Sequence, residues 1–339
     1  MQDVSPVDTR VPTAGSTAAR WLRETALLPV VALMIVVGAI SSPHFLTVSN
    51  LAGVGQQVSA LGVVVVGESL ILLIGGMDLS LESTFGLAPM VAAWLIVPVS
   101  AFGQGAQLNP YLGILILLAV GAAIGIVNGL LIVKSRLNGF IVTLGMTIVL
   151  AGVQNGIVHA QTLFNLPRAF GYLGSAYAGD IPVSLILTAI VFAVVGLFLR
   201  YHRTGRAIYA VGGNPAAARA AGIKVDRIKI GVYVAGGMLA ALGGLIEAGR
   251  VSAVTGQQGY GEGIIFEVFA AAVIGGVSLK GGKGNMVGAA TGVVLLGLVQ
   301  NILDLANVNS YWVEAINGAV ILVALVLSRV IGGEAAAES

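Results

Sequence analysis

The chain has no cysteine, and its three histidines, His44, His159 and His202, are far apart in the sequence. These absences exclude disulfide bonds and thiol catalysis, and they leave no Cys/His spacing of the kind that binds zinc. The G-x-S-x-G motif of serine hydrolases is also missing. The sequence therefore indicates no enzyme, and we expect no metal or cofactor on this chain and no nucleic-acid partner.

Charged residues are also scarce. They make up 9% of the 339 residues, against about 25% in soluble domains, whereas hydrophobic residues reach 57%. A chain of this composition cannot cover a soluble surface. The composition predicts a multi-pass membrane protein, most of whose surface contacts the lipid bilayer.

Apolar runs long enough for a membrane helix recur along the whole chain. A hydrocarbon core about 30 Å thick needs about 20 apolar residues per helix. Ten runs approach that length, so we expect an all-α bundle of about ten transmembrane helices within residues 26–331. The spans are 26–42, 50–75, 79–97, 111–133, 140–158, 183–199, 230–249, 264–277, 286–304 and 311–331. The eighth is short enough to be re-entrant.

The polar loop at residues 200–229 sets the orientation. It contains seven of the 17 Lys and Arg and a single acid, Asp226, and basic loops stay on the cytoplasmic side of a membrane. Alternation from this loop places fifteen of the 17 basic residues inside and leaves only Arg168 and Arg250 outside. We therefore expect both termini in the cytoplasm, with residues 1–25 and 332–339 as tails. Residues 1–25 lack the apolar core and cleavage site of a signal peptide.

A short helix is predicted inside this loop. Asn214 suits an N-cap, Pro215 suits the first helical position, residues 216–221 propagate the helix, and Gly222 suits a left-handed C-cap. A helix of about two turns is not stable alone in water, so it must lean on another surface. It either rests on the membrane or its own bundle, or docks a cytoplasmic partner; the residues alone favour neither.

Polar residues inside the predicted spans are candidates for a translocation path. Glu68 lies within VVVVGESLILLIGG, where a charge is costly unless it faces the bundle interior. It lines a path or gate, or it forms a structural hydrogen bond. The amides could face a path for a polar, neutral solute or could join helices. The amide candidates are Gln57, Asn128, Asn155, Gln300 and Asn301.

Two glycine-rich stretches lie at the predicted inner surface. The first is the inner-side motif Gly75, Gly76, Asp78 and Ser80, where Asp78 is expected to cap the following helix. Its IGGMDL sequence is echoed by IGGVSL at 274–279, which is too short to establish a repeat. The second stretch, SLKGGKGN at 278–285, is not a phosphate-binding Walker loop, because no Gly precedes it at the required spacing and Gly284 follows Lys283. If ATP drives this protein, another chain must bind it.

Several motifs together resemble a known family. LIGGMDLSLES at 73–83, NGLLIVKSRL at 128–137, FIVTLGM at 140–146, TGRAIYAVGGNPAAARAAGIKV at 204–225 and AAAVIGGVSLKGGKGN at 270–285 occur in order. They resemble the permease subunits of bacterial ABC importers for monosaccharides of the ribose, xylose, arabinose and galactose type. The chain departs from that pattern at Asn138 and Gly139, where relatives usually have two prolines, and at Ile265, where they usually have an acid.

The resemblance implies a location and a set of partners. It implies a multi-pass protein of the bacterial inner membrane with a second permease copy, identical or paralogous, and a periplasmic sugar-binding protein. It also implies two cytoplasmic ATPase subunits, which would carry the ATP and Mg. The helix within residues 212–222 would seat in the ATPase. The docking residues are then Arg206, Gly212, Gly213, Asn214, Pro215, Ala218, Arg219 and Gly222.

The resemblance therefore implies a permease that forms the path for a monosaccharide and uses ATP hydrolysed by a partner. A related importer for a polyol, a signalling furanose, a nucleoside or a branched-chain amino acid would have the same architecture. An ion-coupled secondary transporter is the alternative of a different class, with Glu68 as its proton or cation site. A purely structural scaffold would leave the buried Glu68 unexplained.

Overall fold

The computed structural model describes residues 27–255, 263–309, 312, 315–316 and 318–319. The fold is a helical bundle. Its helices are α2 (Leu28–Ser41), α3 (Val48–Leu73), α4 (Leu81–Ile96), the 3-10 helix η1 (Val99–Ala101), α5 (Pro110–Val133), α6 (Gly139–Val158), α7 (Arg168–Ser175), α8 (Val183–Tyr201), α9 (Arg203–Gly213), α10 (Pro215–Ala220), α11 (Val225–Val251), α12 (Ile264–Ile274) and α13 (Met286–Leu305). Two antiparallel pairs of two-residue strands join β1 (Thr162–Leu163) to β4 (Val254–Thr255) and β2 (Tyr177–Ala178) to β3 (Ile181–Pro182).

The predicted spans agree with the helices. Each of the first nine coincides with one apolar helix, and the tenth, 311–331, lies almost entirely outside the described residues, as do both predicted tails. Within the described part of the chain, six helices are long and apolar enough to cross a membrane: α3, α5, α6, α8, α11 and α13. The eighth span contains α12, whose 11 residues reach about 16 Å, roughly half of a hydrocarbon core.

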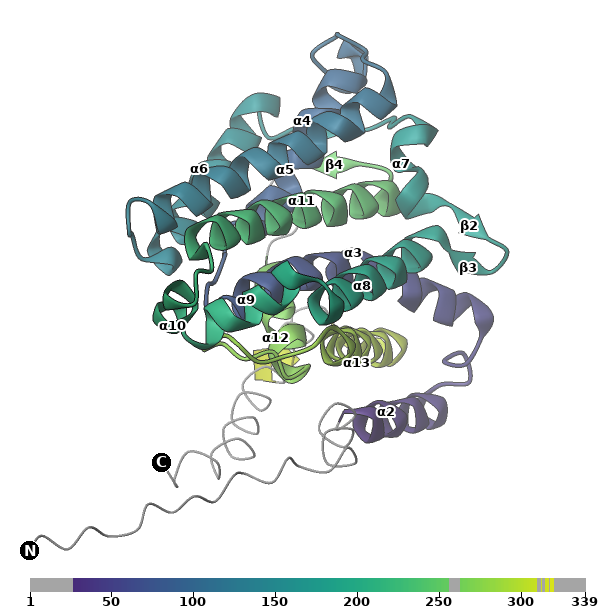
Figure 1. Ribbon diagram of the computed structural model, residues 1–339. Coiled ribbons are helices and arrows are strands. Elements are labelled where there is room, and N and C mark those ends of the chain that lie inside the picture. The colour runs from purple at the N-terminus through teal and green to yellow at the C-terminus, as the bar shows by residue number, and fades with distance from the viewer. Residues whose placement is uncertain (1–26, 256–262, 310–311, 313–314, 317, 320–339) are drawn as a thin grey trace, which may run out of the picture.

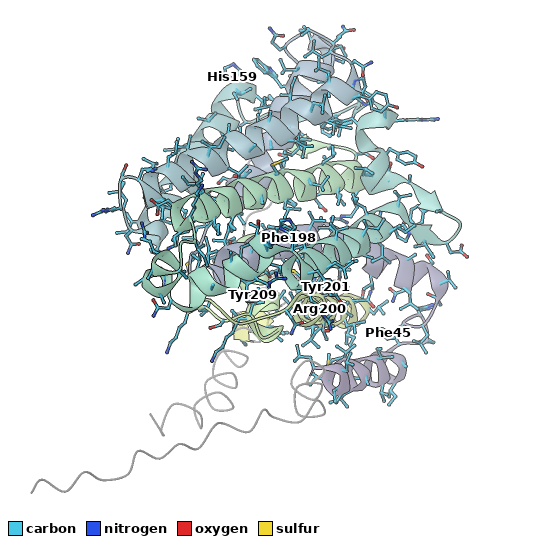
Figure 2. All side chains as sticks on the ribbon, in the orientation of Figure 1. Phe45, His159, Phe198, Arg200, Tyr201 and Tyr209 are labelled. Atoms are coloured by element: carbon cyan, nitrogen blue, oxygen red, sulfur yellow. The ribbon has the colours of Figure 1, made fainter. Side chains whose placement is uncertain are left out.

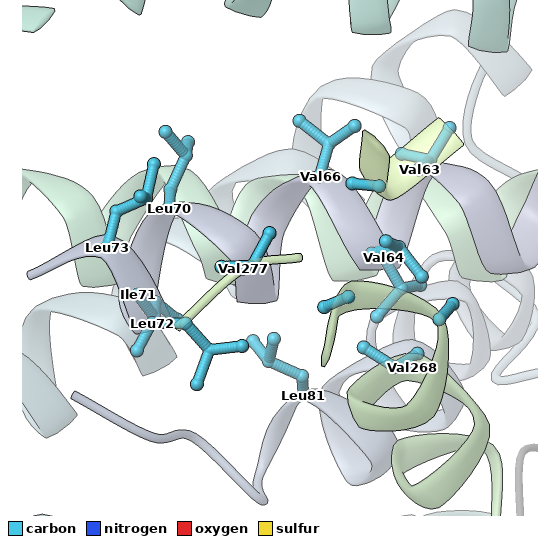
Figure 3. Packing of buried hydrophobic residues seen from close by; sticks show 14 of the residues in the cluster. Val63, Val64, Val66, Leu70, Ile71, Leu72, Leu73, Leu81, Val268 and Val277 are labelled. Carbon is cyan, nitrogen blue, oxygen red and sulfur yellow. The ribbon is translucent and has the colours of Figure 1, made fainter. Parts of the chain in front are cut away.

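Helix α3 lies in the middle of the bundle. Figure 1 shows α11 beside it, with α4, α5 and α6 beyond α11, whereas α8, α12 and α13 lie around the rest of α3 and α2 is outermost. Val63 to Val66 and Ile71 to Leu73 are fully buried, and Figure 3 shows this row of α3 packed near Leu81, Val268 and Val277. A helix that is apolar on all sides suits this central place.

Glycine allows the long helices to approach closely. Gly121, Gly125 and Gly129 lie four residues apart on α5 and face α11. A Cβ at Gly121 or Gly125 would collide with α11 backbone carbonyls, those of Gly237 and Tyr233. The small residues therefore act as a packing surface between the two helices.

The outer faces of the bundle are apolar. Helix α6 exposes Ile141, Leu144, Ile148, Val149 and Val153, which recur at the spacing of one helix face. Such a continuous apolar face would aggregate in water and is typical of a surface in lipid or against another membrane helix. The fold is thus that of a multi-pass membrane protein.

The two ends of the bundle carry different connections. Helices α9 and α10 and the turn between α5 and α6 lie at one end, whereas α7 and the β2–β3 hairpin lie at the other (Figure 1). Lys134 and Arg136 are in that turn, while Arg168 and Arg250 lie in α7 and near the end of α11, which pack together. The loops that charge assigned to opposite membrane sides therefore sit at opposite ends; we call the α10 end the inner end.

Candidate functional site

Helix α10 at the inner end is the predicted loop helix. Asn214 caps it, because its Oδ1 accepts a hydrogen bond from the Ala217 backbone N–H at 2.9 Å. Pro215 is its first residue, and Gly222 follows it with φ of +81°, a left-handed conformation that glycine adopts without strain. The Ile223 N–H returns to the Ala218 carbonyl at 3.0 Å, which closes the C-terminal turn. The start and stop predicted from the sequence are confirmed.

The candidate docking residues divide between two faces. Pro215 and its neighbours on the outer face are exposed, whereas Ala218 is buried in the main core cluster. The Ala218 methyl group therefore anchors α10 to the bundle. Gly212, before α10, is half-buried and also faces the bundle. The exposed candidates are Arg206, Gly213, Asn214, Pro215, Arg219 and Gly222.

Two of the arginines bond locally. The Arg206 guanidinium donates to the Tyr201 carbonyl at 2.9 Å, which satisfies a carbonyl group at the end of α8. Arg219 forms an ion pair with Asp226 at 3.1 Å between exposed side chains. Both are solvent-facing contacts of modest energy, so each arginine can still exchange its partner.

Helix α9 is attached to the end of α3 through a junction of glycines. The Leu73 carbonyl at the end of α3 accepts from the Gly282 N–H at 2.9 Å. Gly212 lies so close that a Cβ there would overlap the same carbonyl and come within 2.5 Å of the Gly282 nitrogen. A Cβ on Gly281 would be 2.7 Å from the Gly75 nitrogen. Three separate segments thus meet backbone to backbone, which only glycine permits.

Tyr209 adds a side-chain contact to this junction. Its hydroxyl donates to the Gly284 carbonyl at 2.9 Å, and Tyr209 is labelled in Figure 2. Burial raises the pKa of the Tyr209 hydroxyl above its ordinary value, so the hydroxyl keeps its proton and remains a donor. The 278–284 loop is therefore held by both α3 and α9.

A buried polar cluster lies behind the junction. The Asp78 carboxyl accepts from the Ser80 backbone N–H at 2.9 Å, from the Ser80 hydroxyl at 2.6 Å and from the Asn128 amide at 3.2 Å. The Asp78 N–H donates to Glu68 Oε1 at 3.4 Å. All four residues are at most 1% exposed. The cluster joins α3, the start of α4 and α5.

The inner-side motif forms the turn after α3 that places Asp78 in this cluster. Gly75 has φ of +71° and the Gly76 N–H returns to the Ile71 carbonyl at 2.9 Å, so α3 ends in a glycine C-cap. A Cβ at Gly76 would be 2.8 Å from the Tyr233 hydroxyl of α11. The expected cap by Asp78 is wrong in detail: Asp78 lies two residues before the N-cap position, which is Ser80, and forms a turn with Ser80 instead.

The short echo of this motif has a counterpart in structure. After α12, Gly276 has φ of +82° and the Val277 N–H returns to the Ala272 carbonyl at 2.9 Å. Ser278 Oγ then accepts from the Lys280 N–H at 3.2 Å, as Asp78 does from Ser80. Both stretches end a helix with a left-handed glycine, but it is the first glycine of IGGMDL and the second of IGGVSL, so the likeness is local and offset by one residue.

The other path candidates lie elsewhere. Gln57 is exposed on α3, and Asn155 is half-buried on α6. Gln300 donates to Asp304 at 3.1 Å, and Asn301 exchanges two hydrogen bonds with Asn50 at 2.8 and 2.9 Å. Of the six candidates, only Glu68 and Asn128 belong to one hydrogen-bonded cluster within the described part of the chain. That the six line a translocation path stays a prediction.

Sequence reasoning missed the residues that hold the inner end together. Tyr209, Leu73 and Gly282 were not candidates, although Tyr209 lies within a recognised motif and Gly282 within the glycine stretch that failed as a phosphate loop. The signal was the two pairs of neighbouring glycines, Gly212–Gly213 and Gly281–Gly282. No pattern in one sequence shows that these pairs meet.

The two departures from the family pattern are accommodated. Asn138 caps α6 by accepting from the Ile141 N–H at 3.3 Å, so the turn that lacks prolines is still ordered by a side chain. Ile265 is buried in the core, whereas Glu267 of the same helix is half-buried. Helix α12 therefore has a single acidic side chain, Glu267.

Comparison with known proteins identifies the family. A family model described as "Branched-chain amino acid transport system / permease component" matches residues 50–325. The ribose import permease protein RbsC of Escherichia coli strain K12 is 37% identical over 313 residues, covering 91% of this chain and 94% of that protein. RbsC of Bacillus subtilis strain 168 is 33% identical, covering 88% and 90%. The galactose/methyl galactoside import permease protein MglC of Salmonella typhimurium is 32% identical, covering 91% and 94%. No solved structure matches the chain. With a family match over most of its length and near full-length relatives, this chain belongs to the family of membrane permease components that includes the ribose and galactose import permeases.

Proposed function

We propose that this chain is the transmembrane permease subunit of an ATP-binding-cassette importer for a monosaccharide, in the inner membrane of a bacterium. The near full-length similarity to ribose and galactose import permeases carries this proposal. The capped helix α10 supports it, since a subunit without an ATP site needs a rigid surface through which an ATPase subunit can move it. The description of the family model supports a second candidate function, a permease for a branched-chain amino acid or another small solute.

In the proposed assembly, two permease copies span the membrane with about ten helices each and with termini in the cytoplasm. A pair of ATPase subunits, which carry ATP and Mg, docks at the inner end. A periplasmic binding protein delivers the sugar at the opposite end, where α7 and the β2–β3 hairpin lie. Selection for one sugar can then reside in the binding protein.

The proposed cycle is alternating access. Closure of the ATPase dimer on ATP would move α10. Because α9 is joined to α3 through Leu73, Gly212 and Gly282, that movement would reach the central helix directly. A shift of α3 repacks its neighbours, since packed helices change between discrete arrangements and do not deform continuously. The path would thereby open alternately to the two sides.

Purification of the tagged chain from native membranes in mild detergent, with mass spectrometry and an ATPase assay, tests the partnership. A chain that purifies with an ATPase subunit and hydrolyses ATP supports the proposal. We expect Ala217→Trp, on the exposed face of α10, to reduce the retained ATPase by roughly tenfold, because a bulky group blocks a small-residue contact. Ala178→Trp, exposed at the opposite end, is the control and should retain it.

An uptake assay with labelled ribose, galactose and leucine in the native cell separates the two candidate solute classes. Deletion of the chain should abolish uptake of one sugar and leave leucine uptake unchanged. Loss of leucine uptake alone would make the amino-acid alternative correct. A chain that purifies without an ATPase and still moves solute along an ion gradient would contradict both.

Glu68→Gln distinguishes an ATP-driven permease from a proton-coupled carrier. The change keeps the oxygen that accepts from the Asp78 N–H and removes the ionisable group. For an ATP-driven permease we expect uptake within about twofold of wild type and no response to a collapsed proton gradient, because a neutral acceptor suffices here. Loss of uptake together with gradient dependence in the wild type would show that Glu68 carries a coupling proton.

A further inference from the structure

The loop of residues 278–284 lies beside the docking helix and reaches the same end of the bundle. The Gly282 N–H bonds to the Leu73 carbonyl, and a Cβ on Gly282 would be 2.7 Å from the Gly213 Cα, one residue before the cap of α10. Nothing separates this loop from the start of the docking helix. A partner that covers α10 therefore approaches the loop as well.

The loop is rigid and has two different sides. Its backbone closes on itself through the Ser278 N–H to the Lys283 carbonyl at 2.9 Å and the Gly281 N–H to the Ser278 carbonyl at 3.1 Å. Val277 and Gly281 are buried on its inner side, as Figure 3 shows for Val277 beside α3. The loop is thus fixed before any partner arrives, which lowers the entropy cost of binding.

The outer side of the loop is apolar and basic. Leu279 is 46% exposed, and Lys280 and Lys283 are exposed beside it. Residues 274–285 contain no Asp or Glu, and the single acid of residues 200–229, Asp226, is paired with Arg219. A surface with an exposed leucine followed by two lysines, neither of which forms an ion pair with another described residue, fits a partner that offers an apolar pocket within an acidic patch.

We propose that residues 278–283 form a second docking element for the cytoplasmic ATPase subunit, in which Leu279 enters an apolar pocket and Lys280 and Lys283 face carboxylates of that subunit. This inference rests on the proposed function. It assigns to the ATPase a contact surface made of two segments, α10 and the loop, that are about 65 residues apart in the sequence and joined by the glycine junction. Movement of the ATPase would then act on α3 from both sides of Leu73.

A membrane surface is the competing occupant, because anionic lipid headgroups also attract lysine. The continuity with α10 favours the protein. The turn at residues 134–138 has similar chemistry, with exposed Leu137, Lys134 and Arg136, yet it belongs to the α5–α6 connection and not to the junction. It therefore serves as a matched control within the same chain.

The first experiment places a photo-crosslinking amino acid at position 279 of the full chain in native membranes, with position 137 as the control. We expect a covalent product at 279 with a chain that contains an ATP-binding motif, mapped by mass spectrometry to a peptide rich in Asp or Glu. Product with lipid alone at 279, or equal product with the ATPase at 137, would overturn the proposal.

The second experiment reverses the charges. Lys280→Glu with Lys283→Glu should reduce ATPase retention in detergent by about tenfold, the effect of two exposed charge pairs lost and turned repulsive. Lys134→Glu with Arg136→Glu should leave it unchanged. Exchange of an acid for lysine in the crosslinked ATPase peptide should restore retention. Unchanged retention after the first reversal would refute the second docking element.

These outcomes are distinguishable from failure of the proposed function. If the wild-type chain retains no ATPase at all, the importer proposal fails first. If Ala217→Trp releases the ATPase and the lysine reversal does not, the importer proposal stands and this inference alone is wrong. If the lysine reversal instead lowers the phosphatidylglycerol that copurifies, the loop binds lipid.

Discussion

Gly212→Ala is expected to destabilise the protein by about 2–4 kcal/mol and to abolish uptake, whereas Gly213→Ala should be neutral or slightly stabilising. The new methyl group at position 212 would overlap the Leu73 carbonyl and approach the Gly282 nitrogen to 2.5 Å. It would therefore break the hydrogen bond from the Gly282 N–H to the Leu73 carbonyl, which costs about 1 kcal/mol of stability. Overpacking by the methyl group would cost about 1–3 kcal/mol more. A Cβ added at position 213 would meet nothing within 4 Å, and alanine favours a helix over glycine.

The measurement is equilibrium unfolding of the purified variants in mixed micelles, together with uptake in cells. The two glycines are neighbours at the end of α9, so the change in helix propensity is similar and the main difference is the contact of position 212 with Leu73 and Gly282. Equal stability of the two variants would mean that α9 does not press against the end of α3. A Gly212→Ala protein that keeps its stability and its ATPase but loses uptake would show that the junction serves coupling alone.

Asn128→Leu is expected to lower the free energy of unfolding by about 2–4 kcal/mol. The substitution nearly keeps the side-chain volume, yet it removes the amide donor from a buried Asp78 carboxyl and from Ser80 Oγ, which lies at 2.7 Å. A carboxyl in the protein interior that loses a donor carries the cost of its desolvation, which exceeds the net value of one hydrogen bond. Asn155→Leu, on α6, should cost less than about 1 kcal/mol, since Asn155 is only half-buried.

A double-mutant cycle assigns the loss to the Asp78–Asn128 pair. Because both changes disrupt one network, Asp78→Ala and Asn128→Leu together should cost about 1–3 kcal/mol less than the sum of the single changes. Strict additivity would contradict the geometry of the cluster and would leave Asn128 as a packing residue.

The helices and their caps could be predicted from the sequence, because the patterns that mark them are local. Runs of apolar residues predicted nine helices within a few residues, because a membrane helix must satisfy its own backbone and cover itself with apolar side chains. The Asn214 cap and the Gly222 stop were predicted for a similar reason. Each acts on its own neighbours in the chain, so its effect does not depend on the rest of the fold.

The sequence did not predict which distant segments contact one another. Ala218 is a residue of a docking helix in sequence, yet its methyl group points into the bundle, and this depends on how α10 lies on α11. Glu68 was expected either on a path or in a structural bond, and the choice depends on Asp78 ten residues away being folded back over the end of α3. The orientation of Ala218 and the partner of Glu68 are set by packing between helices, and a single sequence does not show how helices pack.

Composition, period and charge were enough to predict a helical membrane protein, nine of its helices and which loops lie at the same end of the bundle, because these properties act through the solvent or over a few residues. The resemblance to the permease family came instead from the residues of several ordered motifs. The meeting of two glycine pairs beside the Leu73 carbonyl became visible only in the folded chain, as did the buried network of Asp78, Ser80, Asn128 and Glu68. The physical reason is that close backbone contact and buried hydrogen bonds are satisfied by whichever segments the fold brings together, at any separation along the chain.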